Sequence, residues 1–366
     1  MAALWDGLVA RASPNVFMHP AALCAAADLK FANIHVLQAW HDDVTPKKLV
    51  GLWAMQVRSF ALAWPSHLEA LPYEYAFLSS PVIDGSFVED VIPAFLSAIA
   101  EHRTLPKIVS LQSFDAESSS YRAILKSLAE RGGEQLMLSE STRAVVTREF
   151  GIKRSGSTRK KLRQDWNRLA ALGAVDTLND RTPAGVEAAF ETFLRLEAGS
   201  WKGTEGTALL SDAKDAAFVR RLIGALVQQG GASVALLRVN GHAIAAQVLM
   251  YCGSSAYTWK TAFDSEFAKY SPGALLVDKV TEDLFSVPGI DAIDSCSAEG
   301  SFMAQLWSGR RNMVDLLVKV SAGKSLGFTL EAGRRRGYLR LRDVHRRLRA
   351  SNWRRRPKKA ALAAPR

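Results

Sequence analysis

The chain has 366 residues, of which 48% are hydrophobic and 9% aromatic, so it can bury a large core and is long enough for two domains. Its three cysteines lack CxxC spacing, and no run approaches the roughly 18 apolar residues of a membrane span. The net charge of +11 is confined to residues 334–359, which hold thirteen Lys and Arg against the single acid Asp343, so the remainder sums to about −1. We therefore expect a soluble, cytoplasmic, non-exported protein without a disulfide framework, a metal site or a nucleic-acid-binding groove.

The first half alternates apolar runs with helical patterns. Runs rich in β-branched and aromatic residues predict strands, and three- to four-residue apolar spacing predicts helices. The strands are expected over 34–39, 49–57, 75–78 and 107–112, and the helices over 20–30, 87–102 and 119–131. This half contains no GxGxxG, P-loop, HExxH or Gly-x-Ser-x-Gly pattern. It is an α+β or α/β domain without a recognisable site.

A Gly/Ser-rich turn with six basic residues, at 151–163, precedes a helical pattern that ends at Gly173. Three roles are open for the basic residues of this turn. They bind an anionic acceptor, they bind the 3′-phosphate of a nucleotide cofactor, or they are only solvated. We place a boundary before the turn, which gives domains over 1–150 and 151–330 and a basic tail over 331–366.

The second half predicts a definite succession of elements. After a strand at 174–178 come two helices, an antiparallel meander, a helix and alternating short elements, in the order 182–199, 211–229, 233–239, 243–251, 256–262, 273–285, 292–296, 302–307 and 312–318. The Asn240-Gly241 pair is the strongest hairpin signal in the chain. The strand–loop–helix junction at 256–285 is its chemical centre. The backbone N–H groups at a helix start can bind a polyphosphate, and Gly273 permits close approach.

Four ordered segments of this half resemble one known family. They are EAGSWKGTEGTAL (197–209), VNGHAIAAQVLMY (239–251), YTWKTAFDSEFAKYSPGALL (257–276) and IDSCSAEGSFMAQLWSGR (293–310). Together they resemble the GNAT acetyltransferases related to the cellulose-biosynthesis protein CelD, which are akin to the FemAB peptidyltransferases. The resemblance implies two GNAT-like domains in tandem, with mixed, mostly antiparallel sheets flanked by helices and a basic helical C-terminal tail.

The resemblance also implies where the co-substrate and the acceptor bind. Acetyl-CoA or another acyl-CoA would lie along the strand at 256–262 and on the helix start at 272–275. The implied cofactor-binding residues are Thr258, Trp259, Lys260, Ser271, Gly273, Ala274 and Leu275. The implied acceptor-binding residues are Trp201, Lys202 and Tyr270. The acceptor would be a small molecule or a glycan.

Three carboxylates near the junction are the candidates for deprotonating the acceptor: Glu197, Asp264 and Asp294. Each has a structural alternative. Glu197 can form an ion pair at a helix end with an aromatic lid, Asp264 can pair with Lys260, and Asp294 can be a hydrogen-bonded residue of its strand. The tyrosine that many GNAT enzymes place on the following helix is missing from FMAQLW, so the general acid has no candidate. Many members also read Tyr-Lys where this chain has Met303-Ala304, which leaves the acceptor open.

Three functions follow from these observations. The first is acyl-CoA-dependent N- or O-acylation of a sugar, a polysaccharide precursor or a small metabolite. The alternatives are a FemAB-like peptidyltransferase that uses aminoacyl-tRNA, and a non-catalytic accessory protein of polysaccharide synthesis. In the tail, Tyr338, Leu341, Val344 and Leu348 recur at three- or four-residue spacing among arginines. The tail is therefore either a cationic amphipathic helix on an anionic membrane or a partner, a non-specific RNA contact, or a solvated extension.

Overall fold

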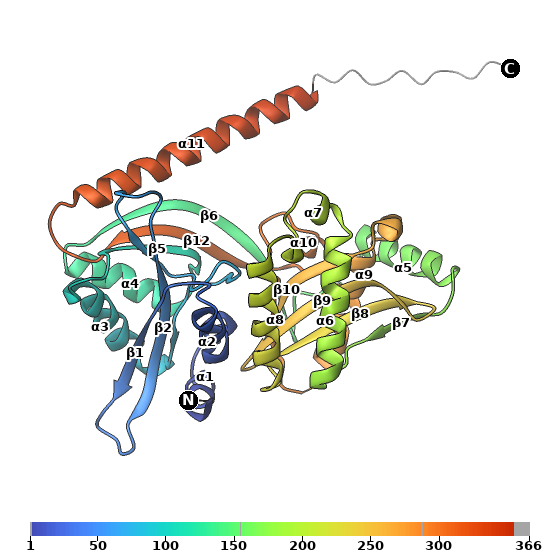
Figure 1. The fold of residues 1–366 in the computed structure, drawn as a ribbon, viewed down its shortest axis with the longest axis horizontal. Helices are drawn as coiled ribbons and strands as arrows, with labels where there is room; N and C mark the ends of the chain where they lie inside the picture. The colour runs from blue at the N-terminus through green and yellow to red at the C-terminus, as the bar shows by residue number, and fades with distance from the viewer. Residues whose placement is uncertain (1, 154, 287, 355–366) are drawn as a thin grey trace.

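Figure 1 shows the computed structural model, in which two lobes lie side by side along one continuous β-sheet. The structure describes residues 2–153, 155–286 and 288–354 and, within these ranges, the side chains of residues 3–342. Residues 355–366 of the predicted tail lie outside the described part. We call residues 2–147 together with β12 (Gly309–Lys319) the first lobe, and residues 155–308 the second lobe. Among the described helices, none is both long enough and apolar enough to cross a membrane.

The first lobe is built from small helices around a strongly twisted half of the sheet. Its elements are α1 (Ala2–Val9), α2 (Pro20–Asp28), β1 (Ile34–His41), β2 (Lys48–Arg58), β3 (His67–Glu69), β4 (Val82–Ile83), α3 (Val88–Glu101), β5 (Ile108–Asp115), α4 (Ser119–Glu130) and β6 (Glu134–Thr147), with 3₁₀ turns at Val16–Met18 and Gly85–Phe87.

The second lobe has helices on both faces of a meander. Its elements are α5 (Ser157–Ala170), β7 (Val175–Leu178), α6 (Pro183–Ala198), α7 (Trp201–Thr204), α8 (Ala213–Val227), β8 (Ala232–Val239), β9 (His242–Cys252), β10 (Ser255–Phe263), α9 (Pro272–Ser286), β11 (Ala292–Asp294) and α10 (Met303–Leu306), with 3₁₀ turns at Leu209–Ser211 and Ser265–Tyr270. The helix α11 (Leu326–Arg354) follows β12 and projects from the first lobe (Figure 1).

Alternation along the meander explains why both of its faces are covered. In β8, Val234 and Leu236 belong to the core that includes α6 and α8, whereas Ala235 and Leu237 belong to the core that includes α9. Successive side chains of a strand point to opposite faces, so a strand apolar at every position needs helices on both sides. The Asn240-Gly241 turn joins β8 to β9 with φ of 50° and 79°, which confirms the predicted hairpin.

The position of one strand, β12, makes the sheet continuous. The strand order is β1-β2-β3-β5-β12-β6-β11-β10-β9-β8-β7, with β4 paired to β2. The strand β12 follows the second lobe in sequence but lies between β5 and β6 of the first lobe, antiparallel to both. At its far end β6 pairs with β11. Because β6 is fourteen residues long, it reaches from the first lobe into the second.

These observations confirm the expected α+β class, the mixed and largely antiparallel strand pairing and the flanking helices. The predicted sheets are joined into one. The range 151–330 includes β12, which pairs within the first lobe, so we propose the two lobes, rather than the contiguous ranges, as the structural units. The strand predicted over 75–78 is wrong: this segment is irregular, and Tyr75 packs against Phe31 and Phe218 instead. The sequence analysis also did not predict β6.

The helix α11 is attached to the first lobe by a polar cluster at its start. Glu331 is fully buried and accepts hydrogen bonds from Trp64 Nε1 (2.8 Å) and from Arg335 Nε (2.8 Å). Burial alone would raise the pKa of Glu331, but the hydrogen bonds from Arg334, Arg335 and Trp64 outweigh it and lower the pKa to about 2. Arg335 Nη2 also lies 3.1 Å from His67 Nε2 of β3.

His67 makes this attachment sensitive to acid. Burial, followed by the charge of Arg335, lowers the pKa of His67 to about 4, while an unfolded histidine titrates near 6.5. The unfolded state therefore binds the proton first, and stability falls as pH drops from about 6.5 toward 4. We predict that His67→Gln removes up to roughly 3 kcal/mol of this pH dependence, because one pKa unit corresponds to about 1.4 kcal/mol. Urea unfolding at pH 7 and pH 4.5 measures it. His242→Gln, on the exposed β8–β9 turn, is the matched control. If the free energy of unfolding of the His67 variant changes with pH as much as that of wild type, His67 is not the group responsible.

Candidate functional site

The strands β10 and β11 separate in the middle of the second lobe. They pair in parallel over only three residues, Ser255–Tyr257 with Ala292–Asp294. Beyond Tyr257, β10 continues to Phe263 and stays paired with β9, with a register irregularity between Thr258 and Lys260. At the point of separation Thr258 Oγ1 donates to the Asp294 carbonyl (3.2 Å) and contacts Met303 Sδ (3.3 Å). The sheet therefore divides after Tyr257 and Asp294, beside Met303 of α10.

A pocket of about 460 Å³ lies at this opening, and we call it the α9 pocket. Its lining comes from α5, the first residues of α7, the outer half of β10, the start of α9 and the segment around α10. The lining residues are Thr158, Lys161, Leu162, Trp201, Lys202, Thr261, Phe263, Ser271, Pro272, Gly273, Ala274, Phe302, Gln305 and Leu306. A Cβ at Gly273 would lie 3.4 Å from Thr261 Cγ2 and 3.5 Å from Phe263 Cδ1. The start of α9 therefore lies close to β10, at a distance where a Cβ would make ordinary van der Waals contact.

The pocket has a positive end and an apolar wall. The first turns of two helices border it, Thr158 in α5 and Pro272–Ala274 in α9, and a helix start carries a partial positive charge. Lys161 adds a cationic group, whose Nζ pairs with Asp165 of the same helix and lies 2.6 Å from Ser271 Oγ. Ser271 is in the left-handed region, with φ of 53°, and ends the 3₁₀ turn that precedes α9. This end of the pocket suits a phosphate-bearing ligand.

The structure brings some of the expected residues to the pocket and leaves others outside it. Ser271, Gly273, Ala274, Trp201 and Lys202 line it. Five other expected residues have their side chains elsewhere: Thr258 at the base of the opening, Trp259 and Lys260 toward the first lobe, Leu275 in the core and in an adjoining groove, and Tyr270 buried against Phe267. Consecutive residues of a regular strand point to opposite faces, but the register irregularity after Thr258 interrupts this alternation. Both Trp259 and Lys260 can therefore contact Tyr75. Contacts through their backbone stay a prediction.

Several pocket residues were not among the predicted site residues, and they include Lys161 and Thr158 at the positive end and Phe263, Phe302 and Leu306 in the apolar wall. The basic segment at 151–163 carried the signal for the first two, because it combines Gly and Ser at a helix start with lysines one turn later. Its spacing could not show that α5 packs beside α9. Only that packing places Lys161 at Ser271.

Glu197 lies at the centre of a buried charge cluster between α6 and β10. Its exposed fraction is 1%, and Oε1 lies 2.9 Å from Lys202 Nζ and 4.0 Å from Lys260 Nζ. Oε2 accepts the backbone N–H of Leu209 (2.9 Å). Burial lowers the pKa of Lys260, and the charge of Glu197 opposes this shift. The helix-end ion pair that was the structural alternative for Glu197 is therefore present, and its partner Lys202 links this cluster to the α9 pocket.

Asp264 has a local structural contact. Its side chain accepts the N–H of Glu266 (2.9 Å) and caps the 3₁₀ turn that leads to α9. Lys260, which was the alternative partner for Asp264, lies beside Glu197 instead. The Asp264 side chain is not among the residues that line the α9 pocket.

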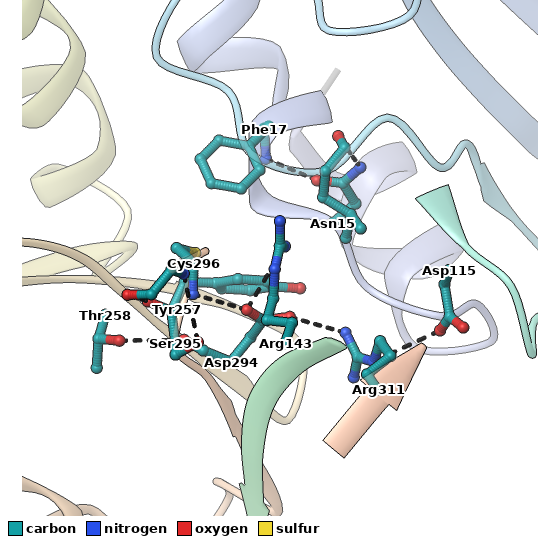
Figure 2. Close-up of polar contacts among 12 residues, drawn as sticks. Asn15, Phe17, Asp115, Arg143, Tyr257, Thr258, Asp294, Ser295, Cys296 and Arg311 are labelled. Carbon is teal, nitrogen blue, oxygen red and sulfur yellow. Dashed lines mark hydrogen bonds and ion pairs between the residues drawn. The ribbon is translucent and has the colours of Figure 1, made fainter. Parts of the chain in front are cut away.

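Asp294 is buried at the end of β11 among groups from both lobes, as Figure 2 shows. Its Oδ2 accepts from Arg311 Nη1 of β12 (2.8 Å), and its Oδ1 lies 3.6 Å from Arg143 Nη1 of β6. Oδ1 also accepts the N–H of Cys296 (2.8 Å), whose φ of 49° turns the chain away from β10. Arg311 Nε continues the cluster to Asp115 Oδ2 (3.5 Å). These bonds fix Asp294 where the two strands separate.

Residues 156–299 match the model of a family described as acetyltransferase (GNAT) domain. The second lobe matches a GNAT domain. The match ends before β12, the strand that pairs within the first lobe. No curated protein matches the chain significantly. Among the described residues, no group of three or more His, Cys, Asp or Glu is arranged to hold a metal ion.

Solved structures share the architecture of both lobes. FemX aligns with a TM-score of 0.60 at 11% identity, over 87% of this chain and 96% of FemX. The C-terminal domain (DUF2156) of a putative lysylphosphatidylglycerol synthetase from Agrobacterium fabrum gives 0.55 at 14%, over 86% and 96% of the two chains. The structure of L-PGS from Bacillus licheniformis gives 0.51 at 15%, over 86% and 91%. At these identities the likeness shows the fold alone.

The bonding of Asp294 in the GNAT domain gives a testable difference between two of the candidate carboxylates. We predict that Asp294→Asn lowers the free energy of unfolding by about 3–5 kcal/mol, because it leaves the buried Arg143 guanidinium without its charge partner and removes one of the two carboxylates that face Arg311. Asp264→Asn keeps an oxygen that can cap the turn and should cost less than about 1 kcal/mol. Urea unfolding of both variants measures the difference. Equal stability of the two variants would contradict it.

Proposed function

We propose that the protein transfers an acyl group from an acyl-CoA, most simply acetyl-CoA, to an amine or hydroxyl group of a sugar, a polysaccharide precursor or a small metabolite. The observation that carries this proposal is the α9 pocket, where two helix starts and Lys161 lie beside the separation of β10 and β11. The positive end would hold the pyrophosphate. The apolar wall of Phe263, Phe302 and Leu306 would hold the pantetheine arm.

The reaction needs alignment and removal of one proton. The acceptor nitrogen or oxygen forms a bond to the thioester carbon, the carbon–sulfur bond breaks, and CoA leaves as the thiolate. The acceptor must lose its proton to a base as the bond forms. Glu197 is the carboxylate best connected to the pocket, because its ion-pair partner Lys202 lines it. We propose that Lys202 gives one of its protons to Glu197 and takes up the proton of the acceptor, so that the proton removed ends on the Glu197 carboxylate; Asp264 and Asp294 are the other candidate carboxylates.

Binding is the first test of the function. We predict that acetyl-CoA, longer acyl-CoAs or free CoA raise the melting temperature by a few degrees, because a ligand at 100 times its dissociation constant adds about 2.7 kcal/mol to stability. Thermal-shift titration measures this effect. Absence of a shift with every CoA would refute the proposal. Binding of aminoacyl-tRNA in the same titration would favour the FemAB-like peptidyltransferase alternative, and binding of neither ligand would favour a non-catalytic accessory role.

Two lysine variants distinguish a specific contact with the phosphate from a general effect of positive charge. We predict that Lys161→Met weakens acyl-CoA binding by roughly tenfold or more, since a hydrogen bond to a charged group contributes about 1.5–3 kcal/mol. Lys160→Met is the matched control, because Lys160 is exposed on the same helix and does not line the pocket. Calorimetric titration measures both affinities. Equal losses in the two variants would indicate that only the overall charge matters.

The role of Glu197 is separable from binding. We predict that Glu197→Gln, which can still accept the N–H of Leu209, abolishes turnover while acyl-CoA affinity stays within about threefold of wild type. Release of free CoA thiol, followed with a thiol-reactive dye, measures turnover once an acceptor is found. Wild-type turnover in this variant and in the Asp264→Ala and Asp294→Ala variants would refute a carboxylate mechanism.

A further inference from the structure

The first turns of α11 have one face that packs on the first lobe. Phe328, Glu331 and Ala332 are buried, and Phe328 and Ala332 share a small core with Ile108 and Leu317. Three- and four-residue spacing puts these positions on one side of the helix. Together with the bonds of Glu331, they fix which side of α11 faces away from the protein.

The opposite side of α11 is apolar and uncovered. Leu326, Leu330 and Leu341 have exposed fractions of 77%, 41% and 65%. At 100° per residue they fall in one stripe on the far side from Phe328, with the exposed Gly333 and Gly337 between them. A helix that carries an apolar stripe away from its own protein has a surface suited to another apolar phase. Figure 1 shows that α11 extends beyond the first lobe, where no other described element covers it.

The loop between β2 and β3 extends this apolar surface. Phe60 and Leu62 have exposed fractions of 64% and 102%, so Leu62 makes almost no contact with the protein. The loop lies against α11, because Arg334 Cζ is 4.7 Å from the Phe60 ring centroid and Trp64 bonds Glu331. Two large exposed apolar residues on a loop beside an exposed apolar helix stripe form one surface rather than scattered residues.

The charge around the stripe identifies the partner. Arg336, Arg340 and Arg342 are exposed on the described part of α11, and the sequence after Arg342 adds eight Lys and Arg against one acid up to Lys359. A second copy of the chain would bring an equally basic helix, and like charges repel. An anionic bilayer offers both an apolar interior and negative headgroups.

We propose that α11 and the loop at 59–66 form a peripheral membrane-binding surface that takes an anionic lipid bilayer. This surface goes beyond the proposed acyl transfer and does not depend on it. The apolar stripe enters the boundary of headgroups and acyl chains, and the arginines contact the headgroups.

Co-sedimentation of the full-length protein with vesicles tests the surface directly. Wild type should bind vesicles of 70% phosphatidylcholine and 30% phosphatidylglycerol at least tenfold more tightly than pure phosphatidylcholine vesicles, and the preference should shrink between 0.05 M and 0.5 M salt. The triple variant Leu62→Ser, Leu330→Ser, Leu341→Ser should lose at least tenfold in binding to the anionic vesicles. The double variant Leu172→Ser, Leu178→Ser, which changes exposed leucines of the second lobe, is the matched control and should bind as wild type does.

Three outcomes would overturn the proposal. The first is no binding of wild type to anionic vesicles. The second is unchanged binding of the triple variant when its melting temperature shows that it is folded. The third is loss in the triple variant of a dimer or of RNA binding, without vesicle binding by wild type, which would assign the surface to a second copy or to nucleic acid.

Discussion

The insertion of β12 between β5 and β6 is the interaction on which the rest of the structure depends. It makes the last strand of the chain an interior strand of the first lobe, so neither lobe completes its sheet without the other. It also brings Arg311 of β12 and Arg143 of β6 to the end of β11, where both face Asp294. The end of β11, and with it the opening beside β10, is therefore fixed by strands that belong to the other lobe.

Two buried carboxylates of the GNAT domain have different surroundings, and this difference gives them different roles in our interpretation. Asp294 is surrounded by guanidinium groups from two strands and by the N–H of Cys296, at the point where the sheet divides. Glu197 is surrounded by lysines, and one of these, Lys202, reaches the α9 pocket. In this interpretation Asp294 holds the shape of the site. Glu197 takes part in the reaction, because its partner Lys202 touches the pocket.

Positive charge in this chain serves two separate places. A small number of basic residues, with Lys161 foremost, lies at the phosphate end of the α9 pocket beside two helix starts. The larger number lies on and beyond α11, away from the pocket and next to an apolar stripe. The total of +11 describes neither place, since an electrostatic effect depends on where charges lie and what apolar surface accompanies them.

The sequence by itself determined the local elements of the second lobe, the Asn240-Gly241 hairpin and the helix start at Pro272-Gly273, because each depends on residues close together in the chain. It also indicated the family, through four ordered segments. It did not determine that β6 is a strand: its sequence EQLMLSESTRAVVT lacks the regular apolar–polar alternation that predicts one, and its burial requires neighbours, β11 and β12, that come more than 140 residues later. Nor could it determine which partner each charged group takes, as Lys260 beside Glu197 and Lys161 beside Ser271 show. Those contacts join distant parts of the chain, and only the packing of helices on a twisted sheet decides which side chains meet.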